Sequence, residues 1–239
     1  MKRFIIALQF LTRLPTPRVT ADDADFTASM RYFPAAGLVI GAAVAAAGWA
    51  GAWIHPWTGS LAALFAWVGI TGALHLDGLA DLADAKGALH KGRDRLLAVL
   101  ADPHVGSFGV VAIAMQIAAK LVLLHGMIDT HMVGTLILVP AAARIGPLLW
   151  ARWLPPLHDG LGARFAGAIR PVHIILWLVP LGAMGILHPA LLATPIILAA
   201  WGWHLRRTIG GISGDGHGAG IETSETLLLV ALLIEGRLA

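Results

Sequence analysis

Charged side chains are scarce in this chain of 239 residues. Asp, Glu, Lys and Arg make up 13% of the sequence and apolar residues 57%, whereas about a quarter of the residues in a typical globular domain are charged. Two long stretches, residues 32–76 and 171–205, contain no charged residue. Each is longer than the ~20 residues that a helix needs to cross a hydrocarbon core. The composition therefore excludes a disordered chain and a water-soluble single domain, and it predicts an integral membrane protein.

Cysteine is absent, which excludes disulfides, iron–sulfur clusters and thiolate metal sites. A concentrated basic face is missing too, although the formal net charge is +3. The Lys and Arg residues are spread over the loops between apolar segments, as the positive-inside rule predicts, so nucleic acid is not expected as a partner. The apolar run 4–11 is not followed by a small-residue cleavage site. We therefore predict an uncleaved segment at the membrane interface.

Several apolar segments are predicted to cross the membrane. The six candidates are residues 33–54, 59–76, 108–128, 131–150, 172–187 and 189–204. A seventh run, 227–234, is too short to span unless its helix begins near Ala219 and carries Glu222 and Glu225 into the membrane.

The charges between these segments predict the topology. Lys and Arg occur in the long loops, which are residues 1–31, 77–107, 151–170 and 205–224. Neither occurs in the short connections, which are residues 55–60, 129–131 and 188–189. The long loops are therefore expected on the cytoplasmic side. We predict an all-α fold, a polytopic membrane bundle of about six or seven segments arranged as helical hairpins, in a single domain over residues 1–239.

Two basic residues lie within predicted spans. Lys120 is near mid-depth, with Gln116 one helical turn earlier on the same face. A charge at this depth marks a functional site or belongs to an interior structural pair, and both interpretations stay open. Arg144 is about two turns from the span end at Trp150, and we expect its side chain to reach the cytoplasmic headgroups.

Three carboxylates follow the second predicted span. Asp77, Asp81 and Asp84 are spaced so that a helix places them on one face. Their mutual repulsion disfavours that helix unless they share a cation, and oxygen ligands favour a hard ion such as Mg²⁺. A solvated acidic face is the alternative, but apolar residues separate the carboxylates, so we predict a metal site. His75, just before them, is a candidate acid, base or phosphate ligand, or a hydrogen-bonded structural residue.

Two glycine-containing segments complete the polar features. Residues 102–109 precede the third span, where small residues leave backbone N–H groups free to meet an anion, although an ordinary helix start has the same composition. Residues 209–219 are rich in glycine and contain Asp215. This segment matches neither a Walker A loop nor a Rossmann unit, and glycine permits close approach to a bulky ligand. Carboxylates and anion-binding loops on one membrane face are typical of metal-assisted phosphoryl transfer.

At these residues the chain resembles a known family, the cobalamin synthases, which are the adenosylcobinamide-GDP ribazoletransferases of bacterial and archaeal membranes. The resemblance runs nearly from end to end, and the segments that carry it are residues 10–15, 33–37, 74–84, 102–109 and 210–219. The most specific is the His-x-Asp-Gly-x-Ala-Asp-x-x-Asp block that begins at His75. Two departures are modest. Ser213 stands where Thr is expected, and His104 stands where Arg is common, which replaces a permanent cation by a titratable one.

The resemblance implies the last assembly step of the cobalamin nucleotide loop. In this step α-ribazole, or its 5′-phosphate, attacks the cobinamide-bound phosphorus of adenosylcobinamide-GDP, and GMP leaves. Mg²⁺ is the implied cofactor, and the bacterial cytoplasmic (inner) membrane is the implied location, with the active site facing the cytoplasm. The lipid bilayer is thus a partner, and the sequence leaves open whether the chain forms a homo-oligomer.

The resemblance also implies roles for individual residues. His75, Asp77, Asp81 and Asp84 are catalytic, and the three carboxylates hold the metal; which of the four accepts the proton of the ribazole hydroxyl stays open. The residues implied to bind substrate are Arg13, Asp102, His104, Gly106, Gly109, Gly211, Ser213, Gly214, Asp215 and Gly218.

Two alternatives belong to other classes. One is an enzyme like the CDP-alcohol phosphotransferases, which have a similar Asp-rich helix end but normally an Arg where Asp81 follows Ala80 here. The other is a small-molecule transporter, suggested by Lys120 and the glycine-rich spans. Long basic loops on one side favour the enzyme, because transporter sites usually lie near mid-depth.

Overall fold

The computed structural model describes residues 1–165 and 167–238. Within these ranges the chain is helical, without a β-strand, as predicted, and Pro156 and Ile212 form one isolated β-bridge. The α-helices are α1 (Lys2–Leu11), α2 (Asp23–Ser29), α3 (Phe33–Ala52), α4 (Pro56–Thr71), α5 (Leu74–Gly87), α6 (Arg93–Leu100), α7 (Ser107–Asp129), α8 (Val139–Ala143), α9 (Ile145–Trp153), α10 (Leu161–Phe165), α11 (Pro171–Met184), α12 (Thr194–Thr208) and α13 (Gly214–Leu238).

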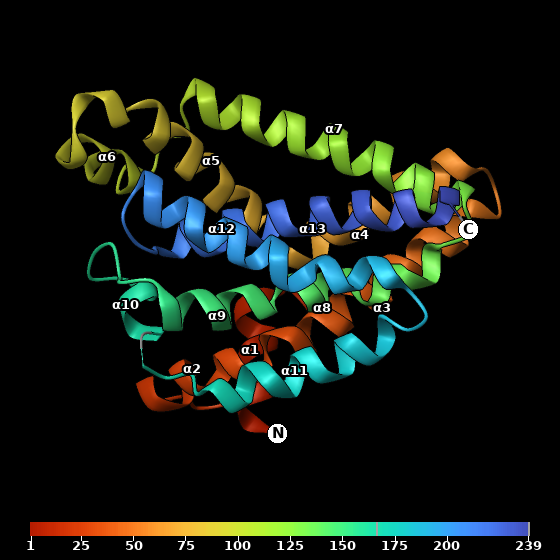
Figure 1. Cartoon of the computed structure of the whole chain (residues 1–239), viewed down its shortest axis with the longest axis horizontal. Helices are drawn as coiled ribbons and strands as arrows, with labels where there is room; N and C mark the ends of the chain where they lie inside the picture. Colours follow the sequence, from red (N-terminus) through yellow and green to blue (C-terminus); the bar gives the residue numbers. More distant parts are fainter. Residues whose placement is uncertain (166, 239) are drawn as a thin grey trace.

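The long helices form a bundle around α13. Figure 1 shows α13 running through its middle, with α7 on one side and α8 and α9 on the other. Helix α13 packs against α5, α7, α8 and α12, and α3 packs along α4 as an antiparallel hairpin. The short helices α2, α6 and α10 lie at one end of the bundle, and the C-terminus lies at the other (Figure 1).

Only some helices of the bundle are long enough to span a membrane. Within the described ranges, four helical segments are long and apolar enough to cross a membrane: Asp23–Ala52, Ser107–Asp129, Val133–Trp153 and Gly214–Leu238. The pair of α4 and α5 passes the same test together and makes a fifth if it counts as one broken span. Helix α11 is apolar but shorter. Each of the seven predicted segments contains a helix, although one of them is broken, and the predicted number of six or seven spans is approximate.

A sharp bend separates α4 from α5. The predicted span 59–76 ends as a helix at Thr71, and the two helix axes differ by 83°. Gly72 and Ala73 both have positive φ, of 60° and 58°, a conformation that glycine adopts easily and alanine does not. Arg13 covers the bend, since a Cβ on Gly72 would lie 2.5 Å from its Nε atom. Its backbone N–H also donates to the carbonyl of Ile70 at 2.7 Å.

The C-terminal apolar run belongs to one long helix. Helix α13 has 25 residues and begins at Gly214, where the Ser213 hydroxyl accepts a hydrogen bond from the Gly216 N–H at 3.0 Å. Glu222 and Glu225 lie inside the bundle, with exposed fractions of 3% and 0%. The run 227–234 is therefore part of a helix that begins before Ala219 and carries both glutamates inward, as its spanning requires.

The N-terminal segment packs into the bundle. Ala7 and Leu11 of α1 are buried in a second, smaller core with Phe33 of α3 and Phe165 of α10. The prediction of a segment at the membrane interface therefore describes α1 incompletely, because one face of this helix is an internal packing surface.

Candidate active site

Helices α5 and α13 cross at two glycines. A Cβ on Gly78 would lie 2.9 Å from the Cα of Asp215, and a Cβ on Gly218 would lie 3.4 Å from the Cα of His75. Any larger side chain at residue 78 would push the helices apart, because the backbone of the partner helix occupies the space. This crossing places the His75 to Asp84 segment directly beside the glycine-rich segment around Asp215.

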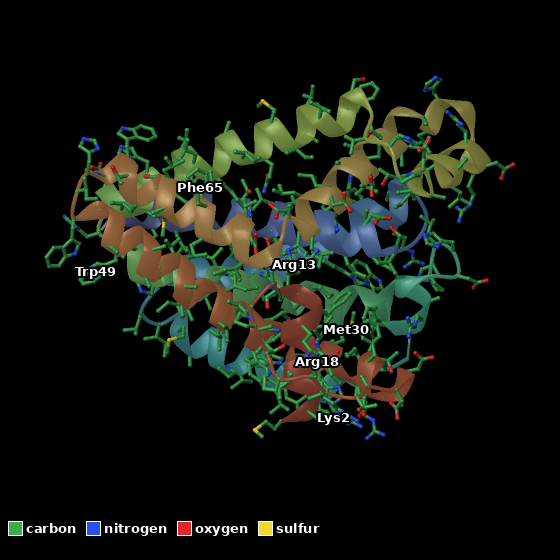
Figure 2. The ribbon with its side chains drawn as sticks, turned by 180° about the vertical axis from the view of Figure 1, so that it is seen from behind. Lys2, Arg13, Arg18, Met30, Trp49 and Phe65 are labelled. Atoms are coloured by element: carbon green, nitrogen blue, oxygen red, sulfur yellow. The ribbon has the colours of Figure 1, made fainter. Side chains whose placement is uncertain are left out.

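A cavity of about 600 Å³, including the part open to solvent, lies at the crossing. One wall is polar and contains His75, Asp77, Asp215 and His217. The other wall is apolar and is made by Phe10, Leu11, Met30, Phe33 and Phe165. Figure 2 shows the N-terminal segment with Arg13 and Met30 against the middle of the bundle. The cavity therefore joins the carboxylates of α5 and α13 to a hydrocarbon surface.

Four carboxylates gather near the cavity. Asp81 experiences the negative charges of Asp215, Asp77 and Asp84, so a fourth carboxylate from α13 joins the predicted α5 triad. Among the residues that the structure describes, no three His, Asp or Glu side chains are grouped closely enough to hold a metal ion by themselves. The donor set is nevertheless made of oxygen atoms, the ligands of Mg²⁺, which is usually bound by one or two carboxylates together with substrate phosphates.

Asp84 has an identifiable structural partner. Its two carboxylate oxygens accept hydrogen bonds from the N–H groups of Gly106, at 2.7 Å, and Gly109, at 3.0 Å. These groups lie at the beginning of α7, where a negative charge is favourable. The sequence leaves open whether these N–H groups meet an anion or simply begin a helix, and the resemblance implies that Gly106 and Gly109 bind substrate. In the structure both N–H groups donate to Asp84 instead.

Asp102 and His104 lie outside the cavity. Their side chains are 52% and 88% exposed, and Asp102 Oδ1 accepts hydrogen bonds from His104 Nδ1, at 2.7 Å, and from its backbone N–H, at 3.0 Å. These bonds, the side-chain one above all, lower the pKa of the Asp102 carboxyl. The pair forms an exposed turn before α7.

The remaining predicted residues lie around the beginning of α13. Gly214, Asp215 and Gly218 line the cavity. Gly211 lies against the Pro155 carbonyl, to which a Cβ would approach within 2.6 Å. The Ser213 hydroxyl is 3.4 Å from Asp215 Oδ2. Gly211 and Ser213 thus hold the loop that presents Asp215.

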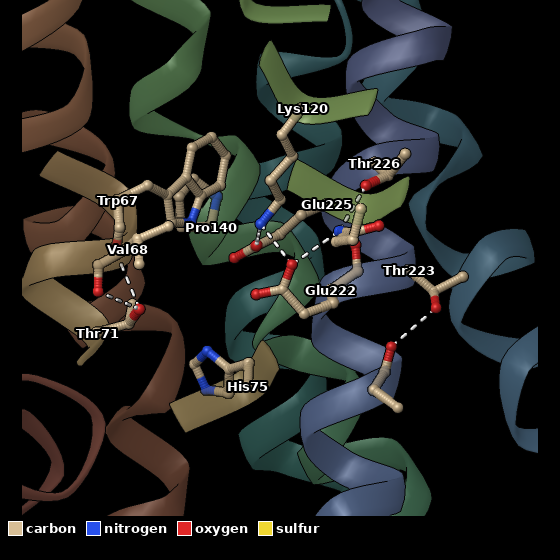
Figure 3. Close-up of polar contacts among 12 residues, drawn as sticks. Trp67, Val68, Thr71, His75, Lys120, Pro140, Glu222, Thr223, Glu225 and Thr226 are labelled. Atoms are coloured by element: carbon tan, nitrogen blue, oxygen red, sulfur yellow. Dashed lines mark hydrogen bonds and ion pairs between the residues drawn. The ribbon is translucent and has the colours of Figure 1, made fainter. Parts of the chain in front are cut away.

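A buried network of charges lies deeper in the bundle. Lys120 Nζ is 2.7 Å from Glu222 Oε2 and 2.6 Å from Glu225 Oε2, and Arg144 Nη1 is 2.8 Å from Glu225 Oε1. Figure 3 shows Lys120 between the two carboxylates. No side chain of the four is more than 4% exposed, and two positive charges balance two negative ones. Lys120 thus belongs to an interior structural pair.

Arg144 departs from its predicted position. It is 0% exposed and does not reach the headgroups, because Glu225 provides its partner inside the bundle. Its Nη2 atom is 3.3 Å from His75 Nδ1. The network therefore extends to the wall of the cavity.

Sequence reasoning missed His217. Its side chain is 7% exposed, lines the cavity and stacks on Trp150 with ring centroids 6.0 Å apart. Neither of its ring nitrogens has a hydrogen-bond partner among the described residues, and the same holds for His75 Nε2. The available signal is its place between Gly216 and Gly218 in the 209–219 segment, from which glycines, Ser213 and Asp215 are predicted as site residues but not His217.

Comparison with known proteins identifies the family. A family model described as cobalamin-5-phosphate synthase matches residues 3–233. The chain belongs to this family. The cobalamin-5-phosphate synthase match confirms the resemblance inferred from the motifs and the prediction of a transferase in cobalamin biosynthesis.

Similar curated proteins cover the chain almost completely. One from Novosphingobium aromaticivorans is 63% identical over 99% of this chain and 98% of its own length. Proteins from Laribacter hongkongensis and Thiobacillus denitrificans are 49% and 46% identical, over 100% and 99% of this chain and 99% and 95% of their own lengths. All three are named adenosylcobinamide-GDP ribazoletransferase. No solved structure matches the chain.

Proposed function

We propose that the chain transfers the cobinamide phosphoryl group of adenosylcobinamide-GDP to a ribose hydroxyl of α-ribazole, or of its 5′-phosphate, with release of GMP. The hydroxyl oxygen forms a bond to the cobinamide-bound phosphorus, the bond from that phosphorus to the GMP oxygen breaks, and the hydroxyl proton passes to a base of the protein. The observation that carries this proposal is the Gly78 contact with Asp215, which brings two segments of a ribazoletransferase-like sequence together at one cavity.

A carboxylate is the base that this geometry supports best. Arg144 donates only, so His75 Nδ1 accepts its hydrogen bond at 3.3 Å. A neutral imidazole then carries its hydrogen on Nε2, the nitrogen without a partner. In this state His75 donates a hydrogen bond to bound substrate, and the proton of the attacking hydroxyl goes to Asp77 or Asp215.

Mg²⁺ is part of the proposal. One or two of the carboxylates Asp77, Asp81 and Asp215 would hold it together with the diphosphate of the donor, in the mixed ligand set that Mg²⁺ prefers, and this leaves another carboxylate free to accept the proton. When bound, the ion neutralises negative charge on the transferring phosphoryl group and the leaving GMP. Without it, the carboxylates would repel the diphosphate.

The proposed location is a bacterial cytoplasmic membrane, crossed several times, with the cavity facing the cytoplasm. The support is the distribution of charge. Helices α6 and α10, which contain Arg93, Arg95 and Arg164, lie at one end of the bundle (Figure 1). The positive-inside rule assigns such an end to the cytoplasm.

Release of GMP tests the proposed function. The protein is purified in detergent and incubated with both substrates and Mg²⁺, and GMP is quantified by chromatography. We expect GMP to appear only when both substrates are present, to disappear with a chelator and to return with added Mg²⁺. No GMP release by folded protein with both substrates and Mg²⁺ would contradict the transferase assignment, and release unaffected by the chelator would contradict the role of the metal.

A further inference from the structure

The apolar wall of the cavity contains a cluster of phenylalanines from three distant parts of the chain. Phe10 and Phe33 stack with centroids 5.7 Å apart, and Phe165 meets Phe33 edge to face at 5.8 Å. All three line the cavity, and Leu11 and Met30 complete the surface. Phe10 is the least enclosed of the three rings. Phe10 therefore presents the accessible ring of this wall, whereas Phe33 and Phe165, which are 3% and 2% exposed, hold it from behind. The ring offers planar, apolar contact area and no hydrogen-bond donor or acceptor.

The opposite wall offers hydrogen-bonding groups that lack protein partners. His75 Nε2 and both ring nitrogens of His217 are buried without a partner in the described part of the chain. Buried polar atoms are normally hydrogen-bonded, so such a set at a cavity indicates a ligand or water as the missing partner. Asp77 and Asp215, from the same two helices as these histidines, also line the cavity. The cavity is therefore apolar on one side and polar on the other.

Each of the two substrates contains an aromatic nucleoside, guanosine in adenosylcobinamide-GDP and α-ribazole itself. Guanine presents polar groups around its edge, and hydrocarbon contact would leave these groups without hydrogen bonds. The base of α-ribazole, 5,6-dimethylbenzimidazole, presents C–H groups and two methyl groups there. An apolar aromatic wall therefore favours the acceptor base over guanine.

We propose that this cavity is the acceptor site and that it binds the benzimidazole ring of α-ribazole against Phe10, whose ring is held in place by Phe33 and Phe165. The ribose then lies toward His75 and His217, and the attacking hydroxyl lies near the Asp77 and Asp215 carboxylates. This assignment rests on the proposed ribazole transfer. It adds Phe10 and His217 to the residues that recognise substrate, with Phe33 and Phe165 as positioning residues, and it leaves the donor diphosphate on the open, carboxylate side.

The test separates acceptor binding from donor binding. In Phe10→Leu the position stays apolar but the ring is lost, and we expect the KM for α-ribazole to rise about tenfold while the KM for adenosylcobinamide-GDP changes less than about twofold. Phe4→Leu is the matched control. Phe4 lies on the same helix as Phe10 and packs on Tyr32, with ring centroids 6.5 Å apart, but it does not line the cavity, so both KM values should stay unchanged.

A second measurement uses the unmodified protein and does not depend on the folding of a variant. Free 5,6-dimethylbenzimidazole should inhibit GMP release competitively against α-ribazole and not against adenosylcobinamide-GDP, and guanosine should not compete with α-ribazole. Competition of the free base with the donor, or a higher donor KM in Phe10→Leu, would overturn the assignment of the cavity. In either case the unmodified protein would still release GMP, whereas failure of the proposed transfer would abolish that release.

Discussion

The backbones of Gly78 and Asp215 are in contact where α5 crosses α13, and a Cβ on residue 78 would lie 2.9 Å from the Cα of Asp215. This contact sets the distance between the α5 carboxylates and the glycine-rich beginning of α13. It also aligns Asp77 and Asp215 along one wall of the cavity. The site thus depends on the absence of a side chain as much as on the charged groups.

Gly78→Ala should separate the two helices. We expect GMP release to fall at least tenfold, because a small displacement of positioned groups has a large effect on rate. Gly69→Ala is the control, since a Cβ there meets nothing within 4 Å. The measurement is the initial rate of both variants at saturating substrate. Equal rates would show that the close approach at Gly78 is not needed.

Asp84→Asn should destabilise the protein. An amide replaces one of the two acceptor oxygens that bind Gly106 and Gly109, so one N–H bond and the favourable charge at the beginning of α7 are lost. We expect the free energy of unfolding to fall by about 1–2 kcal/mol. This would be measured as a lower Tm in detergent and as faster hydrogen exchange at the two glycine amides. Unchanged exchange at these amides would argue against this anchoring role of Asp84.

Glu225→Gln should disrupt the buried network. It leaves Arg144 without its carboxylate and Lys120 with Glu222 alone. Breaking a buried ion pair costs about 3–5 kcal/mol, so the Tm should drop strongly. Glu235→Gln, at a partly exposed carboxylate near His188, is the control and should have a smaller effect. Similar Tm values for the two variants would contradict the importance of the network.

His75→Asn should weaken catalysis without changing its pH dependence. The variant loses the hydrogen that Nε2 presents to substrate, so the rate of GMP release should fall about tenfold to a hundredfold. The acid limb of the pH–rate profile should remain, because the base in this account is a carboxylate. Disappearance of that limb in the variant would identify His75 as the base.

The long helices and the acidic face of α5 could be predicted because both depend on local sequence. The bend at Gly72 and Ala73 could not, because hydropathy is continuous across residues 59–76 and the positive φ of Ala73 is adopted at a break that Arg13 covers. The same limit explains Arg144. The sequence of one span gives the distance of Arg144 from the membrane surface. It does not give the partner of Arg144, Glu225, which comes from a helix much later in the chain.

The carboxylates of the site could be predicted from the sequence, but the different roles of the three on α5 could not. Asp77, Asp81 and Asp84 are equivalent as a spacing pattern. They differ because Gly106 and Gly109 approach Asp84 alone, while Asp77 lines the cavity with Asp215. The phenylalanine wall has no local signature either, since Phe10, Phe33 and Phe165 come together only through the packing of α1, α3 and α10.

GMP release by Asp77→Asn tests most directly whether carboxylates at the α5–α13 crossing carry out phosphoryl transfer. The substitution keeps the shape of the side chain, and Asp77 is exposed, so the Tm should stay close to that of the unmodified protein. With both substrates and Mg²⁺ at saturation, we predict a loss of at least about a thousandfold in rate. GMP release at the unmodified rate by the folded variant would contradict the account.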